Sequence, residues 1–434
     1  MVLRLNSKDA GFDEAFTAFL GIKRETSIDV GHVVSDIVVA VRDGGDAALV
    51  NYTRQLDRYD LDVADLRVSD AEISTLADTV DAETLAALTV AADRIRDFHA
   101  RQLPDDLDYV DEAGLRLGYR WTPVQAAGLY VPGGTAAYPS SVLMNALPAK
   151  VAGVERLVMT VPTPDGTLNP LVMAAARLAG VDEVYRVGGA QAVAALAFGT
   201  ETIAPVDKIV GPGNAYVAEA KRQVFGVVGI DMIAGPSEVL VLSDGLNDPS
   251  WIAADLLSQA EHDTAAQAIL ITDDAAFADL VEAAVEAHLK TLSRSVTARE
   301  SWETFGAIIV VETLTSAIPL IDRIAPEHLQ IPAENAEALA DGIRNAGAMF
   351  LGRFAPEAVG DYVAGPNHVL PTSRSARFSS GLGTLDFMKR SSRIAVDAAA
   401  LANVGPAAVR LAQAEGLDAH ALSVAIRLNT PSQR

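Results

Sequence analysis

The fold is decided by stretches such as Lys208-Ile209-Val210-Gly211-Pro212-Gly213-Asn214-Ala215-Tyr216, in which a short apolar strand passes through a glycine turn into a helix. Three similar apolar runs precede it, at residues 128–131, 156–161 and 183–187. Each run ends in a Gly/Pro turn and is followed by an alanine-rich helical segment. Strands that alternate with helices in this way are typical of a parallel sheet.

A second series of apolar runs continues the alternation. Its members lie at residues 238–242, 268–272, 307–311, 328–331 and 348–351. The alternation of apolar runs and helical segments is repeated in the two series, although no internal repeat of individual residues is visible. We therefore predict an α/β fold with two units in tandem, joined near Gly235-Pro236.

Both ends of the chain have helical periodicity. Apolar residues recur at helical spacing between residues 28 and 103, and helix candidates follow residue 382. We divide the chain into an N-terminal helical segment (1–115), a first α/β unit (116–235), a second α/β unit (236–381) and a C-terminal helical arm (382–434). An arm this short rarely folds alone, so we expect it to dock on its own chain or on a partner chain.

Composition excludes several classes of protein. The 434 residues include 34 Lys and Arg against 57 Asp and Glu, giving a formal charge of −23, and no cysteine. So acidic a chain is a poor general binder of nucleic acid or of an anionic membrane. Without cysteine it forms no disulfide, thiolate zinc site or iron–sulfur cluster. No apolar targeting segment opens the sequence, and we expect a cytoplasmic protein.

The glycine turns are candidate phosphate sites. The turn at Gly211 precedes a helix, where backbone N–H groups favour anions. It is not the dinucleotide fingerprint, because Tyr216 occupies the third glycine position. Asp231 falls near the place of a ribose-binding acid, although such an acid is common by chance. Similar turns at 130–135 and 187–191 would share one sheet edge with it, which strengthens the case for a ligand site. Ordinary tight turns between strand and helix are the alternative.

Histidine and amide side chains suggest a metal site. Gln259 and His262 lie three residues apart on one face at a helix end, where the helix dipole favours a cation. With Asp361 and His420 they would offer two imidazoles, one carboxylate and one amide oxygen, a set that suits Zn²⁺, Mn²⁺ or Co²⁺. Spacing alone does not show that the four residues meet. Structural or surface roles for these histidines are the alternative.

Two loop segments could carry acid–base chemistry. Glu327-His328 follows Ala325-Pro326 and leads into an apolar strand, so both side chains could line one cleft as a water activator and a proton abstractor. A solvated loop pair is an equally good interpretation. Asp361 and His368 bracket a Gly-Pro-Asn loop, and functional residues concentrate on loops.

Taken together, the ordered motifs resemble those of the histidinol dehydrogenase family. The similarity runs from about residue 20 to residue 428. The matching stretches are 128–134, 138–144, 188–192, 210–214, 231–238, 258–263, 325–329 and 364–372. Each stretch is weak alone, and the ordered set is highly specific.

The resemblance implies a fold, a reaction and a partner. The family has two incomplete Rossmann-like units, an N-terminal helical piece and a C-terminal arm that crosses to the other subunit of a homodimer. Its members oxidise L-histidinol to L-histidine with two NAD⁺ through an enzyme-held aldehyde, using one Zn²⁺ per active site. This is the last step of histidine biosynthesis.

The resemblance also implies roles for individual residues. The catalytic pair is Glu327 and His328. The zinc ligands are Gln259, His262, Asp361 and His420, with His420 donated by the other subunit. The substrate contacts are Ser237, Glu415 and His368, together with the four ligand residues and His328. The NAD⁺ contacts are Tyr130, Gln191 and Asn214.

Three other functions are compatible with parts of the sequence. One is a homologous zinc and NAD dehydrogenase for another small amino or polyol alcohol, although Ser237 and Glu415 are both in place. Another is a metallohydrolase that uses Glu327 and zinc, which the strand-end glycine turns disfavour. The third is a metal-binding protein without catalytic activity.

Overall fold

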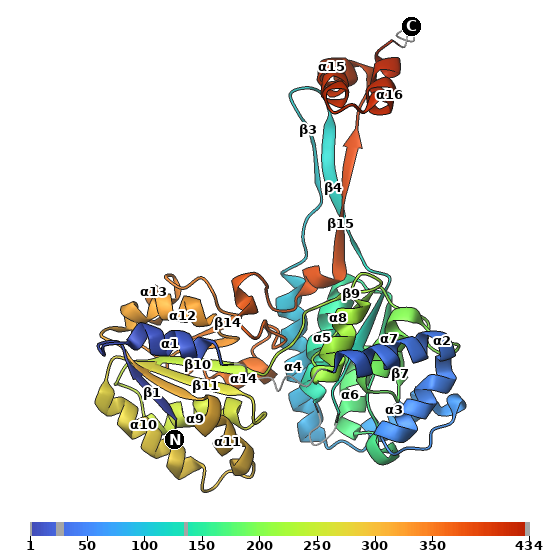
Figure 1. The fold of residues 1–434 in the computed structure, drawn as a ribbon. Coiled ribbons are helices and arrows are strands. Elements are labelled where there is room, and N and C mark those ends of the chain that lie inside the picture. The colour runs from blue at the N-terminus through green and yellow to red at the C-terminus, as the bar shows by residue number, and fades with distance from the viewer. Residues whose placement is uncertain (1, 23–29, 134–137, 430–434) are drawn as a thin grey trace.

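The computed structural model describes residues 2–22, 30–133 and 138–429. Two α/β units lie side by side, and a long antiparallel ribbon with two terminal helices projects away from them (Figure 1). Each unit contains a six-stranded sheet, and the ribbon contains three strands. The predicted α/β fold with two Rossmann-like units is confirmed.

The first sheet is parallel except at one edge. Its strand order is β2-β7-β6-β5-β8-β9, and only β2 pairs antiparallel to its neighbour. The strands are β2 (Arg67–Val68), β5 (Ala126–Tyr130), β6 (Arg156–Thr160), β7 (Glu183–Tyr185), β8 (Lys208–Val210) and β9 (Gly229–Ile230). The carboxyl ends of β5, β7 and β8 therefore lie at one edge, where the three glycine turns were predicted to meet.

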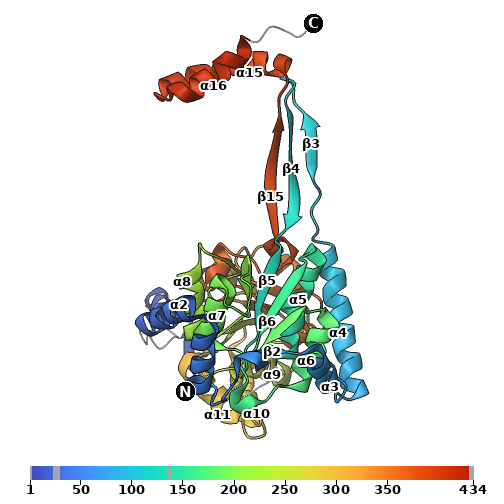
Figure 2. The same cartoon turned by 90° about the vertical axis from the view of Figure 1, so that its right-hand side faces the viewer.

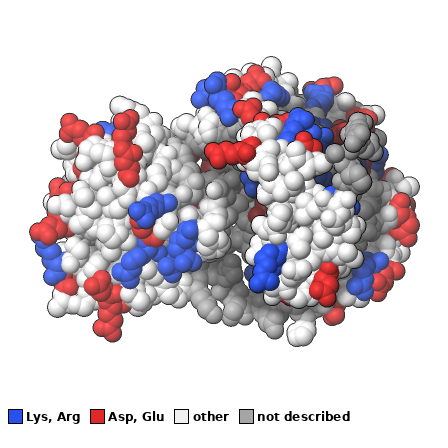
Figure 3. All heavy atoms as spheres, turned by 90° about the horizontal axis from the view of Figure 1, so that it is seen from above, with Lys and Arg blue, Asp and Glu red and all other residues white. Residues whose placement is uncertain are grey.

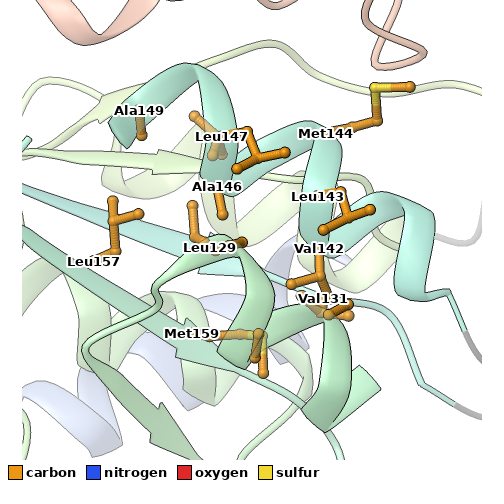
Figure 4. Close-up of a cluster of buried hydrophobic side chains, with 14 of the residues drawn as sticks. Leu129, Val131, Val142, Leu143, Met144, Ala146, Leu147, Ala149, Leu157 and Met159 are labelled. Atoms are coloured by element: carbon orange, nitrogen blue, oxygen red, sulfur yellow. The ribbon is translucent and has the colours of Figure 1, made fainter. Parts of the chain in front are cut away.

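Helices cover both faces of this sheet. The core on one face uses α3 (Asp70–Ala77), α4 (Ala82–Ala100), α5 (Pro139–Ala152) and α6 (Pro170–Ala179). The core on the other face uses α2 (Gly31–Leu56), α7 (Gly189–Phe198) and α8 (Ala215–Val224). Figure 4 shows Leu143 and Leu147 of α5 over Leu129 of β5, all of them fully buried. Near-continuous apolar strands are expected where a sheet is covered on both faces.

The second sheet is parallel throughout, with the order β1-β12-β11-β10-β13-β14. Its strands are β1 (Leu3–Asn6), β10 (Glu238–Ser243), β11 (Gln267–Thr272), β12 (Ala307–Val310), β13 (His328–Ile331) and β14 (Ala348–Leu351). One face packs on α1 (Phe12–Leu20), α12 (Ile318–Ile324) and α13 (Ala336–Ala340). The other packs on α9 (Pro249–Ala260), α10 (Ala275–His288) and α11 (Ser295–Phe305). The short α14 (Glu357–Tyr362) follows β14.

The arm consists of a ribbon and a helical hairpin. The ribbon has the order β15-β4-β3, formed by β3 (Leu107–Val110), β4 (Arg116–Pro123) and β15 (Met388–Ala395). At its far end lie α15 (Ala398–Ala414) and α16 (Asp418–Leu428). Both views place this hairpin far from the two sheets (Figures 1 and 2).

Several strands differ from the predicted division of the chain. β1, β2, β3 and β15 lie in segments that we predicted to be helical, and β4 belongs to the ribbon of the arm. β1 belongs to residues 1–115, which we predicted to be helical, yet it extends the second sheet beside β12. β4 opens residues 116–235, yet it pairs with β15 in the arm. Both pairings join residues more than 250 positions apart, which local periodicity cannot reveal. The four-part division therefore stays a proposal about boundaries.

The surface carries both signs of charge. Acidic and basic side chains are interspersed over the face seen from above (Figure 3). None of the helices in the described ranges is long and apolar enough to cross a membrane.

Candidate active site

The amino ends of β10 and β13 hold two buried glutamates and a buried histidine. Glu238 opens β10, His328 opens β13, and Glu327 immediately precedes His328. The two strands are neighbours, with Val239 opposite His328. All three polar side chains are at most 5% exposed. The Ala325 backbone just before them is left-handed (φ 49°), so the chain turns sharply into β13.

Glu238 and Glu327 hold each other in place. Glu327 Oε2 accepts a hydrogen bond from the backbone N–H of Glu238 at 2.8 Å, and Glu238 Oε2 accepts one from that of Glu327 at 3.3 Å. Glu238 Oε1 also accepts from the N–H of Ser373 at 3.0 Å. Burial raises the pKa of Glu327 well above its usual value, and the charge of Glu238 adds to this. A carboxylate with a raised pKa is a stronger base.

His328 presents one free nitrogen to the site. Its Nδ1 lies 2.9 Å from the carbonyl oxygen of Glu238, so Nδ1 carries the proton and donates it. Nε2 is then the acceptor, and it is buried without a hydrogen-bond partner among the described residues. Burial lowers the pKa of His328, which keeps the ring neutral near pH 7. The ring is therefore prepared to accept a proton at Nε2.

Helix α14 brings two more carboxylates to Nε2. Glu357 and Asp361 are four residues apart and share a helix face. Glu357 Oε1 lies 3.8 Å and Asp361 Oδ1 lies 4.0 Å from His328 Nε2. Burial raises the pKa of Glu357, and burial together with the charge of Glu357 raises that of Asp361 to about 6. One ligand atom each of His328, Glu357 and Asp361 lies within 4.8 Å of the other two, a spacing at which the three could hold a metal ion.

The end of α9 reaches the same cluster. The hydroxyl of Ser258 donates to Glu357 Oε2 at 3.1 Å. Gln259 is 1% exposed, and its Oε1 has no hydrogen-bond partner within the described ranges. His262 is exposed one turn later, close enough for its charge to lower the pKa of His328, after the larger effect of burial.

Two of the predicted substrate contacts border this cluster. His368 Nδ1 lies 3.1 Å from the carbonyl oxygen of Asp361 and 3.7 Å from its Oδ1. Ser237 is partly buried directly before Glu238. Residues from four separate segments of the second unit (237–238, 258–262, 327–328 and 357–368) thus lie close together.

Two predicted site residues lie elsewhere. Glu415 ends α15 and His420 lies on α16, and both are exposed at the far end of the arm. The views in Figures 1 and 2 separate that hairpin from α9 and α14 of the same chain. The end of α9, which carries Gln259 and His262, adjoins the cluster around Asp361 through the Ser258–Glu357 hydrogen bond. The hairpin that carries His420 lies apart from this cluster in the same chain.

The predicted NAD⁺ contacts lie at the carboxyl edge of the first sheet. Tyr130 ends β5, and its hydroxyl accepts from the N–H of Gly189 at 3.2 Å. Burial raises the pKa of Tyr130 to about 12, so the phenol stays protonated. Gln191 is buried with Oε1 unpaired among the described residues, and Asn214 caps α8 by accepting from the N–H groups of Tyr216 and Val217. In the turn at 130–135, residues 134 and 135 lie outside the described residues.

Two residues of the site, Glu357 and Glu238, were not predicted from the sequence. Glu357 lies one helical turn before Asp361, and this spacing was the available signal. Glu238 opens an otherwise apolar, fully buried strand, where a carboxylate has to be hydrogen-bonded. Neither signal is enough to predict a site residue, because the sequence does not show that β10, β13 and α14 lie next to one another.

Known proteins of one family match nearly the whole chain. The family model described as histidinol dehydrogenase matches residues 22–428. The histidinol dehydrogenase of Rhodospirillum rubrum is 64% identical over 430 residues, 99% of each chain, and that of Brucella suis is 62% identical over 99% of this chain and 100% of the relative. The crystal structure of histidinol dehydrogenase from Elizabethkingia anophelis superposes with a TM-score of 0.94 at 36% identity, covering 98% of both chains.

Proposed function

Because the chain belongs to the histidinol dehydrogenase family, we propose that it oxidises L-histidinol to L-histidine with two NAD⁺, by way of an enzyme-held L-histidinal. The observation that carries this proposal is the buried cluster of Glu327, His328 and Asp361, in which a neutral imidazole nitrogen faces the site. As the family's biosynthetic role implies, we place the reaction in the cytoplasm, as the last step of histidine biosynthesis.

The donor groups fit a divalent metal. The buried amide oxygen of Gln259 has no hydrogen-bond partner among the described residues, and a cation could accept its lone pair. Burial raises the pKa values of Asp361 and Glu357, and a nearby cation would stabilise their charged forms. We propose that Gln259, His262 and Asp361 hold Zn²⁺ together with His420 of the partner subunit. When bound, zinc would orient the imidazole and amine of the substrate and act as a Lewis acid.

His328 acts as the proton acceptor of both oxidations in this proposal. Its Nδ1–H stays bonded to the Glu238 carbonyl, so Nε2 takes the hydroxyl proton of the alcohol. It releases this proton to water and then takes the hydroxyl proton of the hydrated aldehyde. When bound, NAD⁺ takes up one hydride in each oxidation. Tyr130, Gln191 and Asn214 are proposed to position it.

Glu327 is proposed to activate water between the two oxidations. Its raised pKa suits it to take a proton from the water that adds to the aldehyde. Because the chain contains no cysteine, no thiohemiacetal forms and the second oxidation proceeds from the gem-diol. Ser237, His368 and Glu415 of the partner subunit are the remaining proposed substrate contacts.

A homodimer with shared sites would complete each active centre. The arm exposes Leu411, Leu422 and Ile426, which are 54–64% exposed. Helix α14 exposes Tyr362, at 60%. Apolar side chains exposed on both segments support docking of the arm on a second copy of the chain, near α14.

Replacing Glu327 separates the two half-reactions. In the Glu327→Gln variant, we expect oxidation of added L-histidinal to slow more than oxidation of L-histidinol to the aldehyde, because only the former needs activated water. Stopped-flow measurement of NADH formation from each substrate checks this. Equal slowing of both half-reactions would assign Glu327 another role.

A substrate panel tests the proposed activity. With purified, zinc-loaded protein and NAD⁺, L-histidinol is expected to give the highest kcat/KM among small amino and polyol alcohols. A higher value for another alcohol would favour the homologous zinc and NAD dehydrogenase. If no alcohol reduces NAD⁺, the metallohydrolase hypothesis returns.

A further inference from the structure

A buried ion pair lies behind the glycine turn that follows β8. Lys221 of α8 and Asp231, which follows β9, pair through Nζ and Oδ1, and their side chains are 2% and 1% exposed. Asp231 Oδ1 also accepts from the N–H of Met232 at 2.7 Å. Buried charges are expected to be paired and hydrogen-bonded, and this pair satisfies that rule.

The ion pair holds both ends of one residue's backbone. Asp231 Oδ2 accepts from the N–H of Gly211 at 2.8 Å, and Lys221 Nζ donates to the carbonyl oxygen of Gly211 at 3.0 Å. Gly211 has a φ of 119°, and a Cβ there would lie 2.1 Å from the carbonyl oxygen of Tyr130. Neither peptide group of Gly211 can turn without breaking a charge-assisted hydrogen bond.

The same ion pair connects the three predicted cofactor-binding elements. Lys221 lies on the helix that Asn214 caps, so the pair fixes α8 relative to the turn. Gly211 packs directly against the backbone of Tyr130. The hydroxyl of Tyr130 accepts a hydrogen bond from the N–H of Gly189, which is close to Gln191. Asp231 is committed to these contacts, so it is not the ribose-binding acid that its position in the sequence suggested.

We propose that Lys221 and Asp231 are positioning residues for the dinucleotide: they hold the turn at residues 211–214 in the conformation that binds NAD⁺. The proposal rests on the proposed use of NAD⁺. A buried ion pair is weak grounds for a role in stability, because apolar pairs often replace it without loss. Its place behind the turn instead favours a role in cofactor affinity.

The test measures cofactor affinity separately from turnover. In Lys221→Met, we expect the Kd of NADH, from fluorescence titration, and the KM of NAD⁺ to rise roughly 10–100-fold, as is typical when groups that orient binding residues are removed. The kcat at saturating NAD⁺, the Kd of L-histidinol and the zinc content should stay near the wild-type values. Asp231→Asn is the milder second variant, since it keeps an oxygen acceptor for Gly211, and a smaller rise is expected.

Arg156→Met is the matched control. Arg156 is the first residue of β6 and Glu183 is the first residue of β7, at the amino edge of the same sheet. Their side chains form an ion pair with an N–O distance of 2.7 Å. Its loss should lower the melting temperature without changing the Kd of NADH.

Each outcome decides the proposal. If Lys221→Met and Asp231→Asn lower the melting temperature but bind NADH as the wild type does, the pair is only structural and the inference is wrong. If Arg156→Met weakens NADH equally, the effect is general destabilisation and the inference is also wrong. If the wild type neither binds NADH nor reduces NAD⁺, the proposed function itself fails.

Discussion

The His328→Asn variant is expected to lose roughly 10²–10⁴ in kcat, the range typical of a lost general base. The KM of L-histidinol should change far less, because the proposed metal ligands remain. Asparagine keeps a polar group near the Glu238 carbonyl but has no basic nitrogen at the position of Nε2. Steady-state rates at saturating L-histidinol and NAD⁺ check this.

His288→Asn is the control for this substitution. His288 ends α10, and its Nε2 lies 2.9 Å from the hydroxyl oxygen of Ser250, on the periphery of the second unit. Its replacement should leave kcat within about twofold of wild type, because substitutions away from the active site and the core usually have small effects. If His328→Asn also keeps its kcat within about twofold of wild type, His328 is not the general base of the reaction.

Mixing two inactive variants is expected to restore activity. His262→Asn removes a ligand from the body of the chain and His420→Asn removes one from the arm, so each homodimer should be inactive. In a hybrid dimer, one site receives both defects and the other receives an intact His262 from one chain and an intact His420 from the other. Random exchange makes about half of the dimers hybrid, so roughly a quarter of wild-type sites should return.

Zinc content gives a second readout of the same experiment. Loss of one imidazole ligand weakens metal binding, so zinc should return in step with activity. Each variant mixed with itself is the control and should stay inactive. If tagged subunits demonstrably exchange and no activity returns, His420 serves its own chain's site or no site.

Local sequence signals were sufficient for the elements near each glycine turn. β5, β7 and β8 end where short apolar runs meet glycine, and their carboxyl ends share an edge because the strands are parallel. The helix end at Gln259 was equally predictable: α9 ends at Ala260, so Gln259 lies in its last turn and His262 lies just beyond it. Such signals depend only on residues within a few positions of each other.

Long-range contacts were not readable in this way. β1 is four residues long and becomes a strand only because β12 offers an unpaired edge more than 300 residues later. The ribbon of β4 and β15 has the same origin. Helical periodicity in the flanking segments gives no information about such partners.

The cluster shows the same limit. The Glu327-His328 pair was visible in the sequence, whereas the roles of Glu238 and Glu357 depend on β10, β13 and α14 lying together. Asp231 shows the converse: its spacing fits a ribose contact, a match that is common by chance, and its side chain is buried beside Lys221. A titratable residue's role depends on what surrounds it, which spacing does not specify.

The stoichiometry of NADH formation tests the central claim most directly. With limiting L-histidinol and excess NAD⁺, complete reaction should give two NADH and one L-histidine per L-histidinol, with no free L-histidinal accumulating. Absorbance of NADH and chromatography of the products measure all three. One NADH per L-histidinol, with the aldehyde released, would contradict the four-electron oxidation.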